Sequence, residues 1–281
     1  MFNKRRPSGI PLARRDGERL QQAPKKNSAP PHQKANESKI HGRNAAIALF
    51  KFRKQDIIRL YVHEEKKEDF KEILDWCAKN KKSYHLVGDQ DLEKLCQGTH
   101  HQGICILAKD KANLTIRDLQ KELPFHHEPC LLVYLDGVSN PHNLGAILRN
   151  CAHFGVKFVL GERDKLPDLS PAAHRISEGA AEHIHLVKID NLSGAFEDLK
   201  KLGFSLVVAD MENSTQSLDS FTFPKRSILV LGAEVAGVSE EMSARGDHIV
   251  HIRGTGVMES MNVSAVSAVF FHEYYRQTIK K

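Results

Sequence analysis

Three short clusters of polar residues and glycine in the C-terminal half of the chain have the composition of a ligand site. They span residues 136–149, 231–237 and 252–264. Each cluster lies at the end of a short apolar run that is typical of a buried strand. In α/β proteins, ligands bind at the loops that follow the carboxyl ends of parallel strands. The sequence therefore predicts that the three clusters form one composite pocket.

The first cluster places an amide, Asn143, a glycine and an arginine at the start of a predicted helix. Gly145 would let a ligand or another backbone approach closely, because glycine has no side chain. Arg149 lies outside the apolar stripe of this helix, and its planar, permanently charged guanidinium group suits a phosphate. An ordinary surface arginine on an amphipathic helix explains the same pattern, so this cluster alone leaves both interpretations open.

The second cluster joins a four-residue apolar strand to Gly232 and Glu234. A carboxylate at the end of a buried strand is costly unless it is paired or binds something. Gly237 and Ser239 also fit an ordinary loop followed by a helix cap. Taken alone, the second cluster favours a structural role.

The third cluster has the most specific pattern of the three. Gly254 and Gly256 lie in a loop after a predicted strand, and Ser260, Asn262 and Ser264 then open the last helix. That helix start presents hydroxyls, an amide and free backbone N–H groups together. The loop is no dinucleotide-binding fingerprint, because the third glycine of GxGxxG is missing, and the chain has no GxSxG hydrolase motif.

Other candidate residues favour structural roles. The adjacent histidine pairs at 100–101 and 126–127 cannot both face one metal from regular structure, so we expect no metal site. His183 and His185 could share one strand face, but no acidic or thiol partner is evident. Cys151 lies near the first cluster and fits a buried, inert thiol.

The elements that must position these clusters alternate regularly between strand and helix. This alternation predicts a parallel sheet covered on both faces. The predicted strands span residues 131–135, 157–160, 184–187, 205–209, 228–231 and 248–252, and the predicted helices span 144–154, 194–202 and 262–279, with a further helix start at 170–171.

A smaller α/β unit of roughly 70 residues is predicted before this domain. Its predicted strands span residues 57–62, 84–87 and 103–108, and its predicted helices span 41–51, 69–79 and 89–95. The predicted domain limits are a tail over 1–38, the small domain over 39–110, a linker over 111–128 and the large domain over 129–281.

The basic character of the chain lies in its first residues. Residues 1–39 hold ten Lys/Arg and three Asp/Glu, a charge of +7, whereas the whole chain carries +6, so residues 40–281 together carry −1. This proline-containing stretch cannot bury enough apolar surface to offset its ordering entropy, so we expect a disordered tail. A basic tail favours a polyanion such as RNA or DNA. A solubilising extension and, less well, a transit peptide are the alternatives.

Cysteine usage and hydropathy bear on the compartment. The five cysteines are scattered, odd in number and never spaced as CxxC, which fits reduced thiols. The sequence has neither a signal-peptide apolar core nor a transmembrane run. We therefore expect a cytoplasmic protein that does not bind membranes.

The three clusters, in this order and at these spacings, resemble the motifs of the SpoU (TrmH) branch of the SPOUT RNA methyltransferases. The resemblance covers about residues 130–277. Residues 39–110 resemble the family's N-terminal substrate-binding domain, an α/β unit like certain ribosomal proteins, through segments 41–45 and 100–103. Within the family, the chain looks most like uncharacterised tRNA/rRNA methyltransferases with a basic N-terminal extension.

The resemblance implies methyl transfer from S-adenosylmethionine to a ribose 2′-hydroxyl in RNA, with rRNA slightly favoured over tRNA as the RNA that is processed. It also implies a parallel sheet threaded into a trefoil knot, and a homodimer with each active site near the subunit interface. The residues that it assigns to catalysis are Arg149, Asn143, Glu234, Ser260 and Asn262. The residues that it assigns to the cofactor are Gly232, Ile252, Met261, Gly237 and Gly256.

Two residues depart from the family pattern. Arg253 stands where the family usually has proline, and Met261 stands where it usually has leucine. Neither change removes a reacting group, but Arg253 lies beside the expected cofactor loop. A catalytically silent RNA-binding protein with the same fold is therefore the alternative function. Methylation of a base, as in other SPOUT branches, is a third possibility that the motifs favour less than ribose methylation.

Overall fold

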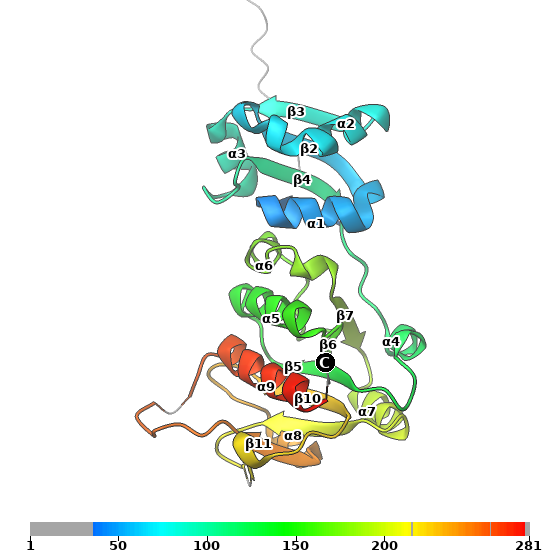
Figure 1. The fold of residues 1–281 in the computed structure, drawn as a ribbon, viewed down its shortest axis with the longest axis vertical. Helices are drawn as coiled ribbons and strands as arrows, with labels where there is room; N and C mark the ends of the chain where they lie inside the picture. Colours follow the sequence, from blue (N-terminus) through cyan, green and yellow to red (C-terminus); the bar gives the residue numbers. More distant parts are fainter. Residues whose placement is uncertain (1–35, 215, 259, 279–281) are drawn as a thin grey trace, which may run out of the picture. The chain divides into compact units, whose positions relative to one another are not determined.

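The computed structural model describes residues 36–214, 216–258 and 260–278 (Figure 1). These described residues belong to one compact unit that contains two β-sheets. Most of the predicted tail lies outside the described residues, so its disorder stays a prediction. The predicted tail limit at residue 38 is too late, because Glu37 and Ser38 already pair with another strand.

The small domain is built on a four-stranded sheet with the strand order β1-β4-β2-β3. Its strands are β1 (Glu37–His41), β2 (Ile57–His63), β3 (Ser83–Val87) and β4 (Ile104–Lys109), and its helices are α1 (Arg43–Arg53), α2 (Lys71–Lys79) and α3 (Asp89–Cys96). Three of these strands and all three helices were predicted. Strand β1 was not predicted, because this edge strand is mostly polar and lacks the apolar run of a buried strand.

The segment between the two domains pairs with the large sheet by backbone hydrogen bonds. It contains α4 (Ile116–Glu122), which begins with a capping box formed by Thr115 and Asp118. Leu114 lies beside a strand of the large sheet, where its N–H donates to the carbonyl of Leu186 at 2.8 Å. The predicted linker is therefore partly an extension of that sheet.

The large domain contains a seven-stranded sheet in the order β7-β6-β5-β10-β8-β11-β9, and every adjacent pair is parallel. Its strands are β5 (Cys130–Asp136), β6 (Phe158–Glu162), β7 (His185–Ile189), β8 (Ser205–Ala209), β9 (Gln216–Ser217), β10 (Arg226–Gly232) and β11 (His248–His251). The predicted parallel sheet is confirmed, and the two-residue strand β9 is an addition to it.

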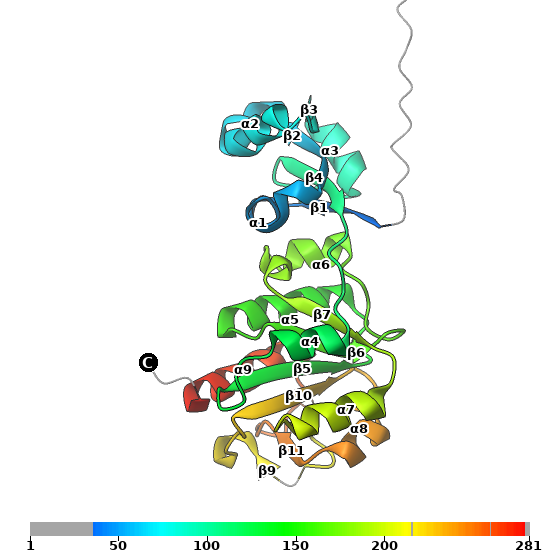
Figure 2. The ribbon, with the colours of Figure 1, turned by 90° about the vertical axis from the view of Figure 1, so that its right-hand side faces the viewer.

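Helices cover both faces of this sheet, as predicted. They are α5 (Pro141–Phe154), α6 (Pro171–Ile176), α7 (Leu192–Lys201), α8 (Glu240–Arg245) and α9 (Val263–Thr278). One apolar cluster joins the sheet to α5, α6 and α9, and a second joins its other face to α4, α7 and α8. Figure 2 shows α7 and α8 on the opposite side of the sheet from α5.

The central strand β5 shows how the sequence produces this arrangement. Its residues point alternately to the two faces, so Val133 and Leu135 enter one apolar cluster whereas Leu132 and Tyr134 enter the other. All four side chains are at most 1% exposed. Burying an apolar side chain of this size contributes about 1.5–3 kcal/mol, which explains why the strand is apolar throughout.

Two further predictions concern the trefoil knot and the absence of a membrane-spanning segment. The trefoil knot stays a prediction. Within the described residues, every helix is too short or too polar to cross a membrane.

Candidate functional site

The three polar clusters start at one edge of the large sheet. Strands β5 and β10 are parallel neighbours, and Asp136 at the end of β5 pairs in register with Gly232 at the end of β10. Strand β11, which precedes the third cluster, is parallel to both, and one strand, β8, lies between β10 and β11. The carboxyl ends of all three strands therefore point the same way, which is the usual position of a ligand site in such a sheet.

Asn262 connects the three clusters through its side chain. Its Nδ2 donates to Asn143 Oδ1 at 3.1 Å and also to Glu234 Oε1. Its Oδ1 accepts from the backbone N–H of Ser264 at 2.9 Å, which caps the start of α9. The three clusters thus meet at Asn262, whereas the pocket that they were predicted to form and the catalytic roles of these residues stay predictions.

The second cluster is a tight backbone turn. The N–H and carbonyl groups of Ala233 and Gly237 bond to each other reciprocally, at 2.9 Å in both directions. A Cβ atom on Gly232 would lie 2.2 Å from the carbonyl carbon of Gly237, so only glycine fits there. Gly237 also has a φ of +67°, which glycine adopts without strain. The glycines of this cluster thus shape the loop that carries Glu234.

Arg149 is free to bind a ligand. Its side chain is exposed on α5, and it makes no hydrogen bond or ion pair with any described residue. The next residue, Asn150, donates to the carbonyl of Ser264 at 2.8 Å and to the Ser267 hydroxyl at 2.9 Å, which fixes α5 against α9. The guanidinium group is therefore carried by a well-fixed helix but has no partner of its own.

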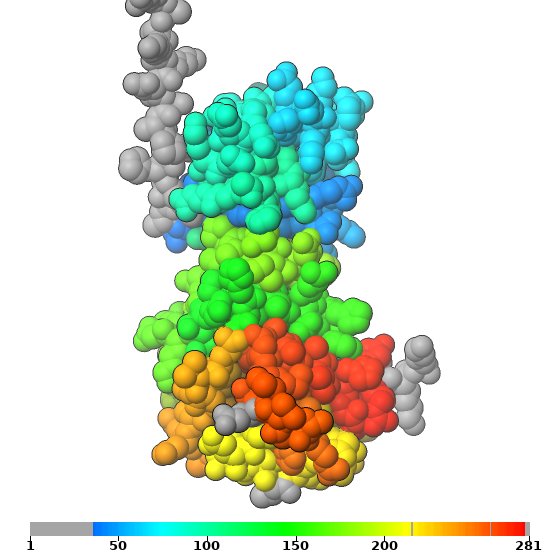
Figure 3. Space-filling view, turned by 90° about the vertical axis from the view of Figure 1, so that its left-hand side faces the viewer, coloured from blue at the N-terminus to red at the C-terminus, as the bar shows by residue number. Residues whose placement is uncertain are grey.

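The loop of the third cluster is exposed, and Figure 3 shows this orange segment at the molecular surface. Gly256 has a φ of +81°, Ile252 is partly buried against the core, and Ser260 is exposed. Arg253 points to Asp219, with 3.8 Å between Nη1 and Oδ2. This exposed pair contributes little to stability. A Cβ atom built on Gly254 or on Gly256 would meet no atom of any described residue within 4 Å other than the two chain neighbours, so the Arg253 side chain does not crowd Gly256.

Large apolar side chains are exposed around this site. Val235 is 100% exposed, Val257 82%, Met258 75% and Met261 50%. They come from the second and third clusters. Neighbouring exposed apolar side chains of this size mark a surface that binds a ligand or another protein.

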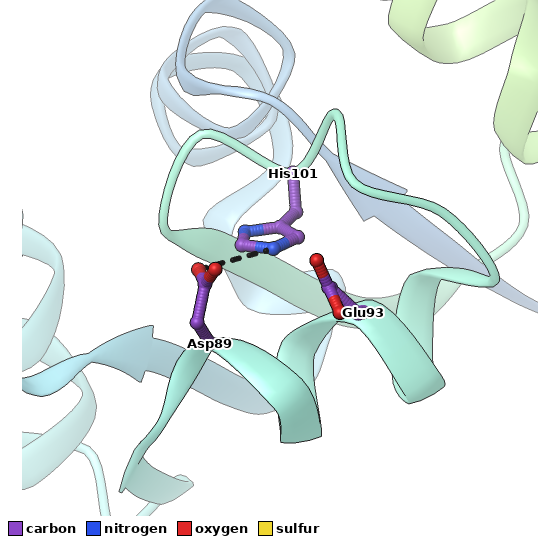
Figure 4. A group of neighbouring side chains, drawn as sticks. All are labelled: Asp89, Glu93 and His101. Atoms are coloured by element: carbon purple, nitrogen blue, oxygen red, sulfur yellow. Dashed lines mark ion pairs between the residues drawn. The ribbon is translucent and has the colours of Figure 1, made fainter.

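A group of possible metal ligands in the small domain has another explanation. Possible ligand atoms of Asp89, Glu93 and His101 lie within 4.8 Å of one another (Figure 4). The Nδ1 atom of His101 accepts a hydrogen bond from the N–H of Gly103 at 3.1 Å, so the imidazole proton belongs on Nε2. Nε2 faces Asp89 Oδ1 at 3.5 Å. With its proton on Nε2, His101 faces Asp89 as a donor and not as a metal ligand, although Nε2 makes no hydrogen bond with any described residue.

The other candidates occupy structural positions. The ring of His183 packs on Phe52 with 4.4 Å between centroids, and His185 stacks on Phe158 at 5.8 Å. Burial raises the pKa of the Cys151 thiol, which matches the predicted inert cysteine.

Two family models match this chain. The model described as "SpoU rRNA Methylase family" matches residues 130–272, and "RNA 2'-O ribose methyltransferase substrate binding" matches residues 39–114. The chain belongs to the SpoU rRNA methylase family. The predicted resemblance to SpoU proteins is confirmed, and with it the predicted enzyme class of RNA methyltransferase.

Curated SpoU relatives cover most of the chain. The uncharacterized tRNA/rRNA methyltransferase YfiF of Escherichia coli O157:H7 is 36% identical over 245 residues, which are 87% of this chain and 70% of the relative. The 23S rRNA (guanosine-2'-O-)-methyltransferase RlmB of Neisseria meningitidis is 30% identical over 249 residues, 88% of this chain and 98% of the relative.

Solved structures of SpoU and rRNA methyltransferases share the fold. AviRb from Streptomyces viridochromogenes, solved with AdoMet, has a TM-score of 0.72 at 19% identity, with 87% of this chain and 92% of that chain covered. The AdoMet-bound rRNA methyltransferase of Sinorhizobium meliloti has a TM-score of 0.73 at 16% identity, with 87% and 89% covered. The predicted two-domain α/β fold is confirmed.

Proposed function

We propose that this protein transfers a methyl group from S-adenosylmethionine to a ribose 2′-hydroxyl in RNA, with rRNA as the favoured substrate. The observation that supports this most strongly is the hydrogen-bonded junction of Asn143, Glu234 and Asn262, together with the exposed and unpaired Arg149 on the same helix as Asn143. The RlmB relatives, whose names give 23S rRNA and guanosine 2′-O-methylation, support the choice of rRNA and of the ribose oxygen.

The loops at the sheet edge fit S-adenosylmethionine. The turn at Gly232 and Gly237 presents backbone at close range, and the open space at Gly256 leaves room for a ligand. The exposed side chain of Met261 and the partly buried Ile252 offer apolar surface for an adenine ring. These five residues are the proposed cofactor site.

The bound cofactor would supply the electrophilic methyl group, so the protein must position and activate the 2′-oxygen. Arg149 is a poor base, because an arginine guanidinium group does not give up its proton in proteins. Its two-pronged donor instead suits a phosphate of the RNA and the charge that develops on the 2′-oxygen. The proton then leaves through that phosphate or through water.

Glu234, Asn262 and Ser260 have a supporting role in this proposal. Asn262 holds the Glu234 carboxylate by a hydrogen bond and fixes the start of α9. Glu234 is thereby oriented at the site as an acceptor for a ribose hydroxyl. Ser260 lies two residues before Asn262 and organises the same loop.

We further propose a homodimer that forms around the site. The exposed apolar side chains of Val235, Val257 and Met258 need cover in water. A second copy of the large domain would provide it. Light scattering on the full chain should then give twice the chain mass, whereas a monomer at all concentrations contradicts this proposal.

We also propose that the protein is located in the cytoplasm.

The alternative, a silent RNA-binding protein, rests on Arg253. In the structure Arg253 pairs with Asp219 and leaves the neighbouring glycines open, so it does not fill the proposed cofactor space. Calorimetric titration with S-adenosylmethionine separates the two functions. Binding to the folded chain supports the enzyme, and a flat titration with folded protein supports the silent alternative.

A further inference from the structure

A pocket of about 240 Å³ lies between the small domain and the end of α6, and none of its lining residues belongs to the three clusters. Its walls include Gly42, Thr99, His100 and Gln102 from the small domain, and Arg175 and Glu178 from the large domain. The small-domain walls come from segments 41–45 and 97–103. These contain the two motifs that the sequence analysis singled out in this domain and that the methyl-transfer site does not use.

Hydrogen bonds connect the walls of the pocket, and two of the wall residues have backbone conformations that are rare for their residue types. The N–H of Arg43 donates to Gln102 Oε1 at 2.7 Å, and Asn44 Nδ2 donates to Glu178 Oε2 at 2.8 Å. Gln102 and Glu178 both have a φ of +51°, in the left-handed region that such residues rarely adopt. Residues held in this region cluster at ligand sites, because the surrounding structure must fix them there.

The groups around the pocket can both donate and accept hydrogen bonds. Arg175 makes no hydrogen bond or ion pair with any described residue through its side chain, and His100 is exposed. Glu178 contributes a carboxylate, and Thr99 a hydroxyl. This mixture of a free cation, an acceptor and uncharged polar groups matches a nucleotide better than a bare anion.

A neighbouring histidine shows that positive groups gather here. His41 is 7% exposed, and its Nδ1 atom has no hydrogen-bond partner among the described residues. Burial and, after it, the charges of Arg175, His101 and His100 together lower the pKa of His41 from 6.5 to about 4. Such a region attracts the phosphates of RNA.

We propose that this pocket binds one unpaired nucleotide of the RNA substrate, with its phosphate on Arg175 and its base against His100, Gln102 and Glu178. The proposal rests on the proposed function in that it takes RNA as the substrate. Proteins read single-stranded RNA by accepting splayed-out bases beside arginine and ring side chains, and the pocket volume suits a single nucleotide. The pocket would then fix the register of the RNA relative to the methyl-transfer site.

The test compares three full-length variants in filter binding to an unmodified 23S rRNA transcript. Arg175→Gln removes the free cation, and Thr99→Trp fills the pocket from an exposed loop position without a charge change. Arg117→Gln is the matched control, because Arg117 is exposed on α4, has no described partner and carries the same charge. Photocrosslinking of the same RNA to the wild-type chain, mapped by mass spectrometry, provides a second readout.

We expect Arg175→Gln, which loses the phosphate contact, and Thr99→Trp, which loses the bound base, each to weaken RNA binding about tenfold. Affinity for a fully paired RNA duplex, S-adenosylmethionine binding and thermal stability should stay as in the wild type. Crosslinks should map to residues 99–102 and 175–178. Unchanged RNA affinity in both variants, an equal loss in Arg117→Gln, or crosslinks only elsewhere would overturn the proposal. A wild-type chain that binds RNA here but transfers no methyl group would count against the proposed function alone.

Discussion

Asn262 shows how much of the candidate site depends on one side chain. A single amide bonds to Asn143 on α5, to Glu234 in the turn after β10 and to the first turn of its own helix α9. These partners lie 119, 28 and 2 residues away in the sequence. Arg149 differs from this group in that no described residue forms a hydrogen bond or ion pair with its guanidinium, which is expected of a group kept for a substrate.

Replacing Arg149 tests its proposed role. Arg149→Lys keeps the charge but loses the two-pronged donor, so kcat/KM for methyl transfer should fall about tenfold, and Arg149→Gln should lower it about 100-fold. The unfolding midpoint should not change, because the side chain is exposed and unpaired. Methyl transfer by Arg149→Lys at the wild-type rate would contradict the bidentate role.

Replacing either of two glycines by alanine is expected to have opposite effects on stability and cofactor binding. Gly232→Ala places a Cβ atom 2.2 Å from the backbone of Gly237, so the turn must shift at a cost of about 1–3 kcal/mol and S-adenosylmethionine binding should be lost. Gly254→Ala meets no atom within 4 Å and has no positive φ, so it is the matched control. Thermal unfolding and calorimetry measure both effects. Equal behaviour of the two variants would show that the turn is not rigid.

At the scale of elements, a buried ion pair connects the small domain to the large one. The Arg53 side chain at the end of α1 donates to both carboxylate oxygens of Glu182, at 2.7 and 3.1 Å, and to the carbonyl of Lys109. Lys111 adds hydrogen bonds to the carbonyls of Glu182 and Ile184, each at 2.8 Å. The linker, α1 and the segment before β7 therefore form one junction.

Breaking this pair should destabilise the chain strongly. Glu182→Gln removes the buried charged partner of Arg53 and leaves the longer ion pair with Asp56 at 3.7 Å, and breaking a buried pair costs about 3–5 kcal/mol. Asp190→Asn breaks the exposed pair with Arg163 and serves as the control, for which we expect no measurable change. Urea unfolding of both variants makes the comparison. A loss for Glu182→Gln as small as that of the control would show that the junction contributes nothing to stability.

Buried histidines predict how stability depends on pH. Burial lowers the pKa of His41 and of His174 from 6.5 to about 4. Between these values the unfolded chain binds more protons than the folded chain, so the free energy of unfolding must fall as the pH is lowered from 6.5 to 4. Each histidine contributes up to about 1.4 kcal/mol per pH unit to this slope.

A variant isolates the histidine contribution. His174→Leu removes one buried imidazole, so urea unfolding at several pH values should show a shallower decline between 6.5 and 4 than in the wild type. A slope equal to that of the wild type would mean that His174 does not titrate in this way.

At the scale of the whole molecule, periodicity predicted the large domain well. Its buried strands are apolar runs, so Leu132 and Val133 can be assigned to the core from the local sequence alone, without knowing which residues they contact. Two strands that are recognised only by their pairing with a neighbouring strand were not predicted. The polar edge strand β1 and the two-residue strand β9 have no apolar run of their own.

The candidate site was predictable only in part. The three clusters were visible because each follows a buried strand, but the partners of Asn262 come from distant segments. The pair of Arg53 and Glu182 spans 129 residues and leaves no local pattern. The pocket at Arg175 likewise forms only when two domains meet. Side-chain pairs of this kind depend on tertiary structure, which spacing along the chain does not encode.

The central claim is that the chain methylates a ribose oxygen of RNA, and alkaline hydrolysis of methyl-labelled RNA tests it most directly. The full chain is incubated with radiolabelled S-adenosylmethionine and unmodified rRNA or tRNA, and the RNA is then digested with alkali. A methylated 2′-oxygen cannot attack its neighbouring phosphate, so we predict label in alkali-stable dinucleotides, more from rRNA than from tRNA. Label released in mononucleotides would show base methylation, and unlabelled RNA from folded protein would contradict the enzymatic account.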